Sequence, residues 1–177
     1  MQIIDLISNQ AEHIEQAVAL LRDSFPCWST YEAAREEVEE SFGEGRISRI
    51  AVDEAGNVIG WIAGISQYSG RVWELHPLVV SQAHRMKGVG RMLVTDFEQQ
   101  AAARGAITIV LGSDDEDGST SFAGQDLYMD FPTQLANFEG NNHPTSFYMK
   151  LGYKIVGVIP DANGLGKPDI TLAKRVR

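Results

Sequence analysis

The sequence has few of the features that would place a protein outside the cell or in a membrane. Among its 177 residues there is a single cysteine, Cys27, so no disulfide can form within the chain. No apolar run approaches the roughly 18–20 residues that a membrane-spanning helix needs. Residues 1–25 also lack the charged start and long apolar middle of a secretory signal peptide. We therefore expect a cytoplasmic protein.

Positive charge is also scarce. The chain carries 24 acidic and 15 basic side chains, a formal net charge of −9. Nucleic acid and anionic membranes need a positive surface field, so we expect neither as a partner, and a cationic small molecule is a better match. The four histidines show no metal-ligand spacing and the cysteine stands alone, so we expect no metal site.

The sequence also lacks internal repeats, low-complexity tracts and a recognisable linker. With 44% hydrophobic residues it can bury one substantial core. We therefore predict a single domain over residues 1–177.

The hydrophobic pattern switches repeatedly between the strand and helix periods. Three central strands, joined by turn-rich segments at 53–57 and 68–71, predict an antiparallel meander. Capping patterns at Asn9 and Ser29 predict the starts of two early helices, the first stopping before Pro26. The predicted strands are 3–7, 47–52, 58–66, 72–80, 106–111, 153–159 and 168–174, and later helices are predicted over 89–104 and 144–151, with a further short helix within 112–142.

The segment Arg85–Gly90 follows an apolar strand and opens an amphipathic helix. The first turn of a helix has backbone N–H groups without internal partners, so glycines at this point build a cradle for an anion such as a pyrophosphate. Gly88 and Gly90 would otherwise be turn and packing residues. Arg85, Lys87 and Arg91 add positive charge where the helix dipole disfavours it, which suits phosphate groups better than a solvated helix start.

This order of elements, β-α-α-β-β-β-α-β-α-β-β with Arg-x-x-Gly-x-Gly opening the central helix, resembles the GNAT superfamily of acetyltransferases. Four segments narrow the resemblance to the aminoglycoside 6′-N-acetyltransferases: Trp73–Val80, Arg104–Asp115, Phe147–Val158 and Pro160–Asp169. The resemblance runs through nearly the whole chain and is weakest over 24–31 and 116–142.

The resemblance implies an α/β fold, with a mixed, mostly antiparallel sheet flanked by helices. It also implies acetyl-CoA as co-substrate, an aminoglycoside as acetyl acceptor, and a homodimer. Pantetheine would lie along the edge of the strand at 78–80, and the phosphates would sit at the cradle. The residues expected to bind acetyl-CoA are Leu78, Val79, Val80, Arg85, Met86, Lys87, Gly88, Val89, Gly90, Arg91 and Tyr148.

Glu74 and His76 stand two apart on a predicted strand, so their side chains share a face. An acetyl acceptor must be a neutral amine, yet alkyl amines are mostly protonated near pH 7. Glu74 is the candidate base, directly or through a water, and the resemblance places a carboxylate here. His76 could order the water, bind the substrate, or be a satisfied polar side chain.

Pro77 removes a backbone donor just before Leu78, which predicts a bulge or a parting of the strand from its neighbour. The resemblance implies that the Leu78 N–H then binds the thioester carbonyl, where an amide stabilises developing negative charge. It also implies that Tyr148 protonates or hydrogen-bonds the departing thiolate. The alternative for Tyr148 is a core aromatic beside Phe147.

Asp114 and Asp115 begin a run of acids after a buried strand, a pattern that usually marks a solvated loop. For a polycationic acceptor the resemblance favours both as contacts. Tyr68, Glu74, His76 and the acids of the second helix would line the rest of the substrate site. The predicted function is transfer of acetyl from acetyl-CoA to the 6′-amine of aminoglycosides, which confers resistance. The alternatives are acetylation of a polyamine or protein N-terminus, and a non-catalytic acyl-CoA sensor.

Overall fold

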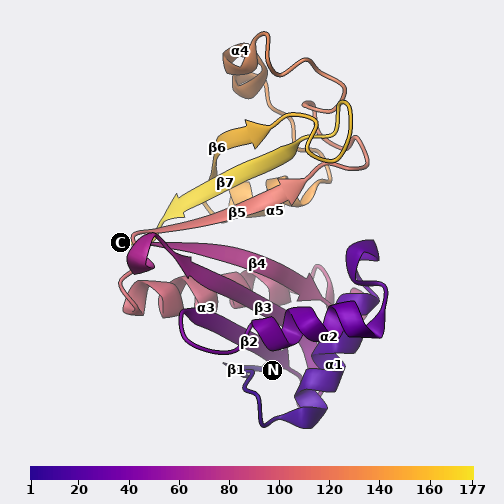
Figure 1. Cartoon of the computed structure of the whole chain (residues 1–177), viewed down its shortest axis with the longest axis vertical. Helices are drawn as coiled ribbons and strands as arrows, with labels where there is room; N and C mark the ends of the chain where they lie inside the picture. The colour runs from indigo at the N-terminus through magenta and orange to yellow at the C-terminus, as the bar shows by residue number, and fades with distance from the viewer. The chain divides into compact units, whose positions relative to one another are not determined.

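The computed structural model describes residues 1–177, which form two compact units (Figure 1). The first comprises Met1–Ile109 with Val176–Arg177, and the second comprises Val110–Arg175. The expectation of one functional domain stays a prediction.

The first unit is built on four strands that follow one another in space as in sequence. These are β1 (Gln2–Asp5), β2 (Arg46–Val52), β3 (Val58–Gln67) and β4 (Val72–Val80), and each pairs antiparallel with the next. The predicted meander is confirmed. The connections from β2 to β3 and from β3 to β4 are short, so their turns and the buried faces of the strands together fix the register, whereas β1 reaches β2 through α1 and α2.

Helices cover both faces of these four strands (Figure 1). On one face lie α1 (Ala11–Arg22) and α2 (Tyr31–Glu40), whose apolar residues pack in one core cluster with Trp61, Ala63 and Val79 of the sheet. On the other lies α3 (Val89–Ala103), which buries Val89, Leu93, Val94, Phe97 and Ala101. A Cβ at Gly64 would collide with the Phe97 ring, so glycine lets α3 lie close to β3.

Two predicted helix starts are shifted. Thr30, not Ser29, caps α2 by accepting a hydrogen bond from the Ala33 N–H at 3.2 Å. Asn9 does not cap α1, which starts after Gln10 without a side-chain cap. The helix does end before Pro26, as predicted, and a short 3₁₀ turn, η1 (Pro26–Trp28), joins it to α2. Neighbouring Ser and Thr residues cap equally well, so sequence alone fixes such a start to within a residue or so.

A bulge interrupts β4 at His76 and Pro77. Leu75 pairs with Gly64 and Leu78 pairs with Ile62, so two residues of β4 stand opposite the single Ala63 of β3. The irregularity predicted from Pro77 is confirmed. Residues directly opposite in a pair share a face, so Leu75 lies on the α3 face with Gly64, and Val79 lies with Trp61 on the face of α1 and α2.

Short 3₁₀ turns flank β4. The turn η2 (Tyr68–Gly70) precedes it, and η3 (Gln82–His84) lies between β4 and α3. Tyr68 and Ser69 both have positive φ, at 48° and 55°, which is uncommon for residues with side chains.

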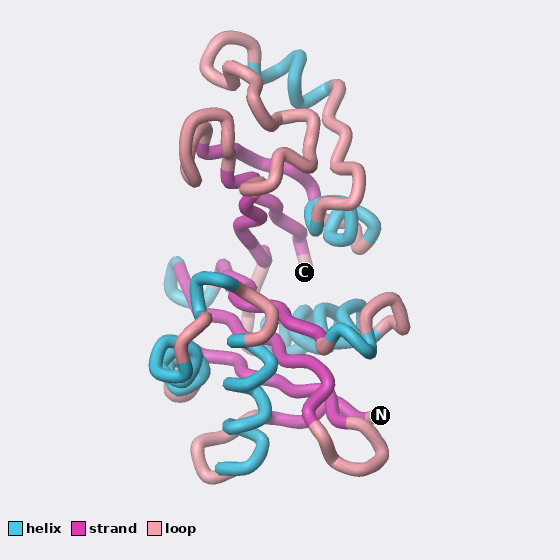
Figure 2. Tube along the Cα trace, turned by 90° about the vertical axis from the view of Figure 1, so that its right-hand side faces the viewer, coloured by secondary structure: helices cyan, strands magenta, loops and turns pink.

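The second unit has three strands in the order β5 (Thr108–Asp114), β7 (Asp169–Arg175), β6 (Lys154–Ile159), and β6 pairs antiparallel with β7. Its helices are the short α4 (Phe131–Ala136) and α5 (Pro144–Lys150). Long loops make up much of this unit (Figure 2). The predicted strand at 106–111 is shifted: it starts at Thr108 and continues to Asp114. The short helix expected within 112–142 is α4. None of the helices is long and apolar enough to cross a membrane.

Candidate active site

Glu74 lies on the face of β4 that carries α1 and α2. Its neighbour Leu75 lies on the opposite face, and successive side chains of a strand alternate. The Glu74 side chain is partly buried, and its carboxylate accepts a hydrogen bond from the Gln67 side-chain amide at the end of β3. A neutral donor of this kind fixes the carboxylate without adding a charge. Gln67 was not among the predicted site residues.

His76 lies on the same face, with its side chain 55% exposed. Its Nε2 is 3.8 Å from Glu37 Oε1 of α2, and its ring centroid is 5.6 Å from that of Trp28 in η1. Neither neighbour was predicted as a site residue by name. Glu37 belongs to the helical acids, but Trp28 falls where the resemblance is weakest.

Burial raises the pKa of the Glu37 carboxyl, and the nearby Glu40 raises it further. Positive charge on His76 and Arg46 and interaction with the Trp28 side chain lower it, but burial dominates. The Glu37 side chain is 22% exposed, whereas the other glutamates of α2 are exposed. Glu37 is also the one that contacts β4, through His76.

The predicted cradle is present at the start of α3. Gly88 precedes the helix with φ 87°, a left-handed conformation that favours glycine, and no atom lies within 4 Å of where its Cβ would stand. The first backbone bond into the helix runs from Met92 N–H to the Gly88 carbonyl at 3.0 Å. The N–H groups of Val89, Gly90 and Arg91 therefore have no partner within the helix and fit an anion.

The basic side chains at the cradle are available to phosphate groups. Lys87 and Arg91 are exposed, whereas Arg85 Nε donates to the Val80 carbonyl at 3.2 Å and so ties the loop to the end of β4. Met86 between them is fully exposed and has a φ of 60°. The first turn of α3 contains no acidic residue that would oppose an anion.

Tyr148 lies on α5 in the second unit and is 8% exposed. Its ring packs edge-on against Phe147 at 5.1 Å and Tyr153 at 5.6 Å between centroids. Burial raises the pKa of the Tyr148 phenol well above its usual range, so the group keeps its proton. This suits a hydrogen-bond donor, and it equally describes an aromatic residue of the core.

The two aspartates after β5 differ sharply. Asp115 is fully buried and accepts hydrogen bonds from Ser119 N–H at 2.7 Å, Thr120 N–H at 2.8 Å and Thr120 Oγ1 at 2.6 Å. Burial alone would raise the pKa of Asp115, but these hydrogen bonds lower it overall. Asp114 is exposed, and its carboxylate accepts from Asn163 Nδ2 at 2.6 Å. Asp115 therefore holds a turn, whereas the Asp114 carboxylate faces solvent.

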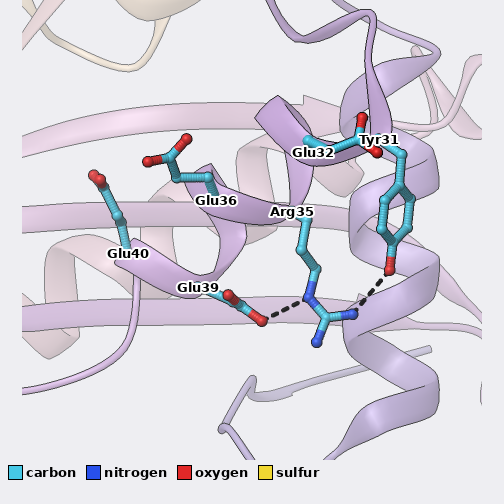
Figure 3. A pocket seen from close by; sticks show the side chains of 6 residues that line it. All are labelled: Tyr31, Glu32, Arg35, Glu36, Glu39 and Glu40. Atoms are coloured by element: carbon cyan, nitrogen blue, oxygen red, sulfur yellow. Dashed lines mark hydrogen bonds and ion pairs between the residues drawn. The ribbon is translucent and has the colours of Figure 1, made fainter.

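Of the other predicted substrate contacts, Tyr68 is 75% exposed in η2. The acids of α2 line an open groove of about 540 Å³ (Figure 3). One cation lies among them, Arg35, which donates to Glu39 at 2.6 Å and to the Tyr31 hydroxyl at 3.0 Å. The groove is lined by Tyr31, Glu32, Arg35, Glu36, Glu39 and Glu40.

A strand with a bulged centre, a glycine cradle and a helix behind it define an acetyltransferase of the GNAT class. Residues 14–126 match the family model described as "Acetyltransferase (GNAT) family", and the chain belongs to this family. The predicted family and fold are confirmed. No curated protein matches the chain.

Within this class the chain is similar to aminoglycoside 6′-N-acetyltransferases of known structure. One, complexed with coenzyme A, is 42% identical with a TM-score of 0.95. Another, from Enterococcus faecium, is 43% identical with a TM-score of 0.92. A third, of type Ii, is 38% identical with a TM-score of 0.78. Each comparison covers 100% of this chain and 98% of the other.

Proposed function

We propose that this protein is an aminoglycoside 6′-N-acetyltransferase, which transfers acetyl from acetyl-CoA to the 6′-amine of aminoglycoside antibiotics. The observation that carries the proposal is similarity over the full chain, at 42% and 43% identity, to two enzymes of that name. Acetylation replaces an ammonium by a neutral amide. It thereby weakens the drug's attraction to ribosomal RNA and confers resistance.

Acetyl-CoA supplies the activated thioester when bound. We propose that the β4 edge at 78–80 holds its pantetheine and that the N–H groups of Val89, Gly90 and Arg91 hold its pyrophosphate. The side chains of Arg85, Lys87 and Arg91 flank that cradle, and the backbone of Met86 and Gly88 shapes it. One relative carries coenzyme A, which supports this choice of ligand.

The chain's own residues would carry the two proton transfers. Glu74 takes a proton from the acceptor ammonium, and the neutral nitrogen becomes the nucleophile. The Leu78 N–H stabilises the negative charge that develops on the thioester oxygen. Tyr148, held protonated by burial, donates to the departing thiolate and is reprotonated by the attacking nitrogen, which loses its second proton as it becomes an amide.

Recognition of a polycation needs negative charge, and the net charge of −9 provides a favourable field. We propose Asp114, Tyr68, Glu74 and His76 as aminoglycoside contacts. Asp115, predicted with them, would act through the turn that it holds. The acidic side chains of α2 would line a further side of the aminoglycoside site.

We also propose that residues 1–177 act as one GNAT domain, that the protein is a homodimer, and that it works in the cytoplasm. The family resemblance supports all three, and sedimentation velocity of the purified protein tests the dimer.

The function is tested by incubating the protein with acetyl-CoA and a panel of amines. Release of coenzyme A with kanamycin or tobramycin is expected, and NMR of the product should place the acetyl group on the 6′-nitrogen. Turnover with polyamines or N-terminal peptides but not with aminoglycosides would replace this proposal by the first alternative. Binding of acetyl-CoA without turnover of any amine would favour the other alternative, a non-catalytic acyl-CoA sensor.

A further inference from the structure

His76 has contacts of two different kinds on the face of β4 that carries Glu74. The Glu37 carboxylate faces its Nε2 at 3.8 Å, and the Trp28 ring packs against the imidazole at an interplanar angle of 57°. Both neighbours come from segments distant in sequence. Together they restrain an imidazole that would otherwise turn freely in solvent.

Each of these neighbours is itself fixed. Glu37 belongs to a helix anchored by the buried Ala34 and Val38, so its carboxylate cannot move far from β4. Trp28 packs edge-on against Phe25, at 5.4 Å between ring centroids and an interplanar angle of 87°. At 3.8 Å the Glu37 carboxylate is beyond hydrogen-bond distance of Nε2, so it acts on the ring through its charge.

We propose that Glu37 is a positioning residue, which with Trp28 holds the His76 ring on the face of β4 that carries Glu74, where the ring takes over the proton that Glu74 removes from the acceptor amine. This role rests on the proposed function. It decides among the three roles that the sequence leaves open for His76.

The proton balance of the relay is complete. An N–H bond of the ammonium breaks and an O–H bond forms on Glu74. The proton then passes to the unprotonated ring nitrogen of His76, which restores the Glu74 carboxylate for the next turnover. The Cα atoms of residues two apart on a strand are about 6.7 Å apart and their side chains share a face, so a water between the two side chains can carry the proton. Glu37 stabilises the imidazolium, which loses its proton to solvent through the exposed part of the ring.

The charged groups around this pair favour the same direction of transfer. The Glu40 carboxylate lies on the same helix as Glu37, and Arg46 at the start of β2 offsets part of that negative charge. Glu74 faces the same side of β4. The imidazolium is thus formed among carboxylates, which stabilise positive charge.

A double-mutant cycle tests whether Glu37 acts through His76. We expect Glu37→Gln to lower kcat for the aminoglycoside roughly tenfold, with little change in KM and a shifted pH profile. In a His76→Gln background the same change should have no further effect on kcat. Glu36→Gln, which removes the same charge from the preceding residue of α2, is the matched control and should affect KM at most.

Equal losses from Glu37→Gln in the presence and absence of His76 would overturn the proposal, as would an unchanged kcat in the folded Glu37→Gln protein. Thermal unfolding of each variant shows whether it is folded. If instead the wild type acetylates no amine, the proposed function fails. The contact between Glu37 and His76 can then still be tested by a measurement that does not depend on activity.

That separate measurement is the titration of the Glu37 carboxyl, followed by carbon-detected NMR in the protein without substrate. Positive charge on His76 lowers the pKa of Glu37. His76→Gln should therefore raise the midpoint of this titration, and Trp28→Phe should raise it by a smaller amount. A midpoint that does not move in His76→Gln would show that the two side chains do not interact, and the proposal would fall whatever the enzyme acetylates.

Discussion

The Gln67 side chain at the end of β3 donates a hydrogen bond to the Glu74 carboxylate on β4. The two residues come from adjacent strands of the meander, so the pairing of those strands sets their distance. A neutral amide donor adds no charge and gives the carboxylate a fixed direction, which suits a base next to an ammonium.

Glu74→Gln should lower kcat by roughly 10²-fold or more and remove the acidic limb of the pH profile, because the proton acceptor is lost. Gln67→Ala should cost about 1 kcal/mol, roughly fivefold in kcat, because only the orientation is lost. Steady-state kinetics with tobramycin between pH 5 and 9 measures both. A Glu74→Gln enzyme that changed only KM would show that Glu74 is a counter-ion.

Tyr148→Phe should lower kcat by roughly 10²-fold while acetyl-CoA affinity is nearly kept, because the change removes one hydroxyl and leaves the buried ring in place. Since burial raises the pKa of this phenol, its ionisation should produce no alkaline limb in the wild-type profile below about pH 10. Calorimetry of acetyl-CoA binding separates the two effects. Full turnover in the variant would assign Tyr148 to the core alone.

Gly90→Asp should weaken acetyl-CoA binding at least about tenfold, because it places a carboxylate among the free N–H groups that open α3. Isothermal titration calorimetry measures the affinity, and Gly90→Ala is the control that adds a Cβ without charge. If the folded Asp variant bound as tightly as wild type, the phosphates would have to lie elsewhere.

The KM for aminoglycosides should rise with added salt. Between about 0.01 and 0.15 M the screening length falls from about 30 Å to about 8 Å, which weakens the attraction of a polycation to exposed carboxylates. Asp114→Asn should flatten this dependence, because it removes one exposed charge. A KM that is independent of salt would contradict an electrostatic contribution to recognition.

Asp115→Asn should destabilise the protein by about 2 kcal/mol at pH 7, because the buried carboxylate accepts from three donors and an amide cannot serve all of them. The folded-state pKa of Asp115 lies below its ordinary value of 3.8. The stabilisation is therefore present above that value and lost as the pH falls through the lower folded-state pKa. Urea unfolding of wild type and variant at pH 7 and at pH 3 measures it, with the exposed Asp114→Asn as control.

Much of the fold could be predicted because its signals are local. The alternation in β2–β4, the apolar face of α3 and the glycine at position 88 each depend on residues within a few positions of one another. The bulge at Pro77 was predictable for the same reason: a missing backbone donor disturbs pairing in any sheet.

The contacts around the proposed site could not be predicted from local pattern. Glu37 and Trp28 reach His76 only because α2 and η1 pack over β4, and nothing in their own neighbourhoods distinguishes them from a solvated acid and an apolar loop residue. Asp115 posed the opposite difficulty. It stands in a run of acids typical of a solvated loop, yet the turn at 119–120 buries it and supplies its donors.

The extra residue in β4 shifts the alternation of its side chains between the two faces of the sheet by one position. Upstream of Pro77 the even-numbered Glu74 and His76 lie on the side of α1 and α2, while downstream the odd-numbered Val79 takes that side. Deleting Pro77 would remove the extra residue and leave His76 alone opposite Ala63. Glu74, His76 and Val79 would all keep their face, because the remaining residues would alternate regularly. The deletion would take away only the break in strand pairing just before Leu78, so the extra residue matters to the backbone at this point and not to the direction of the side chains.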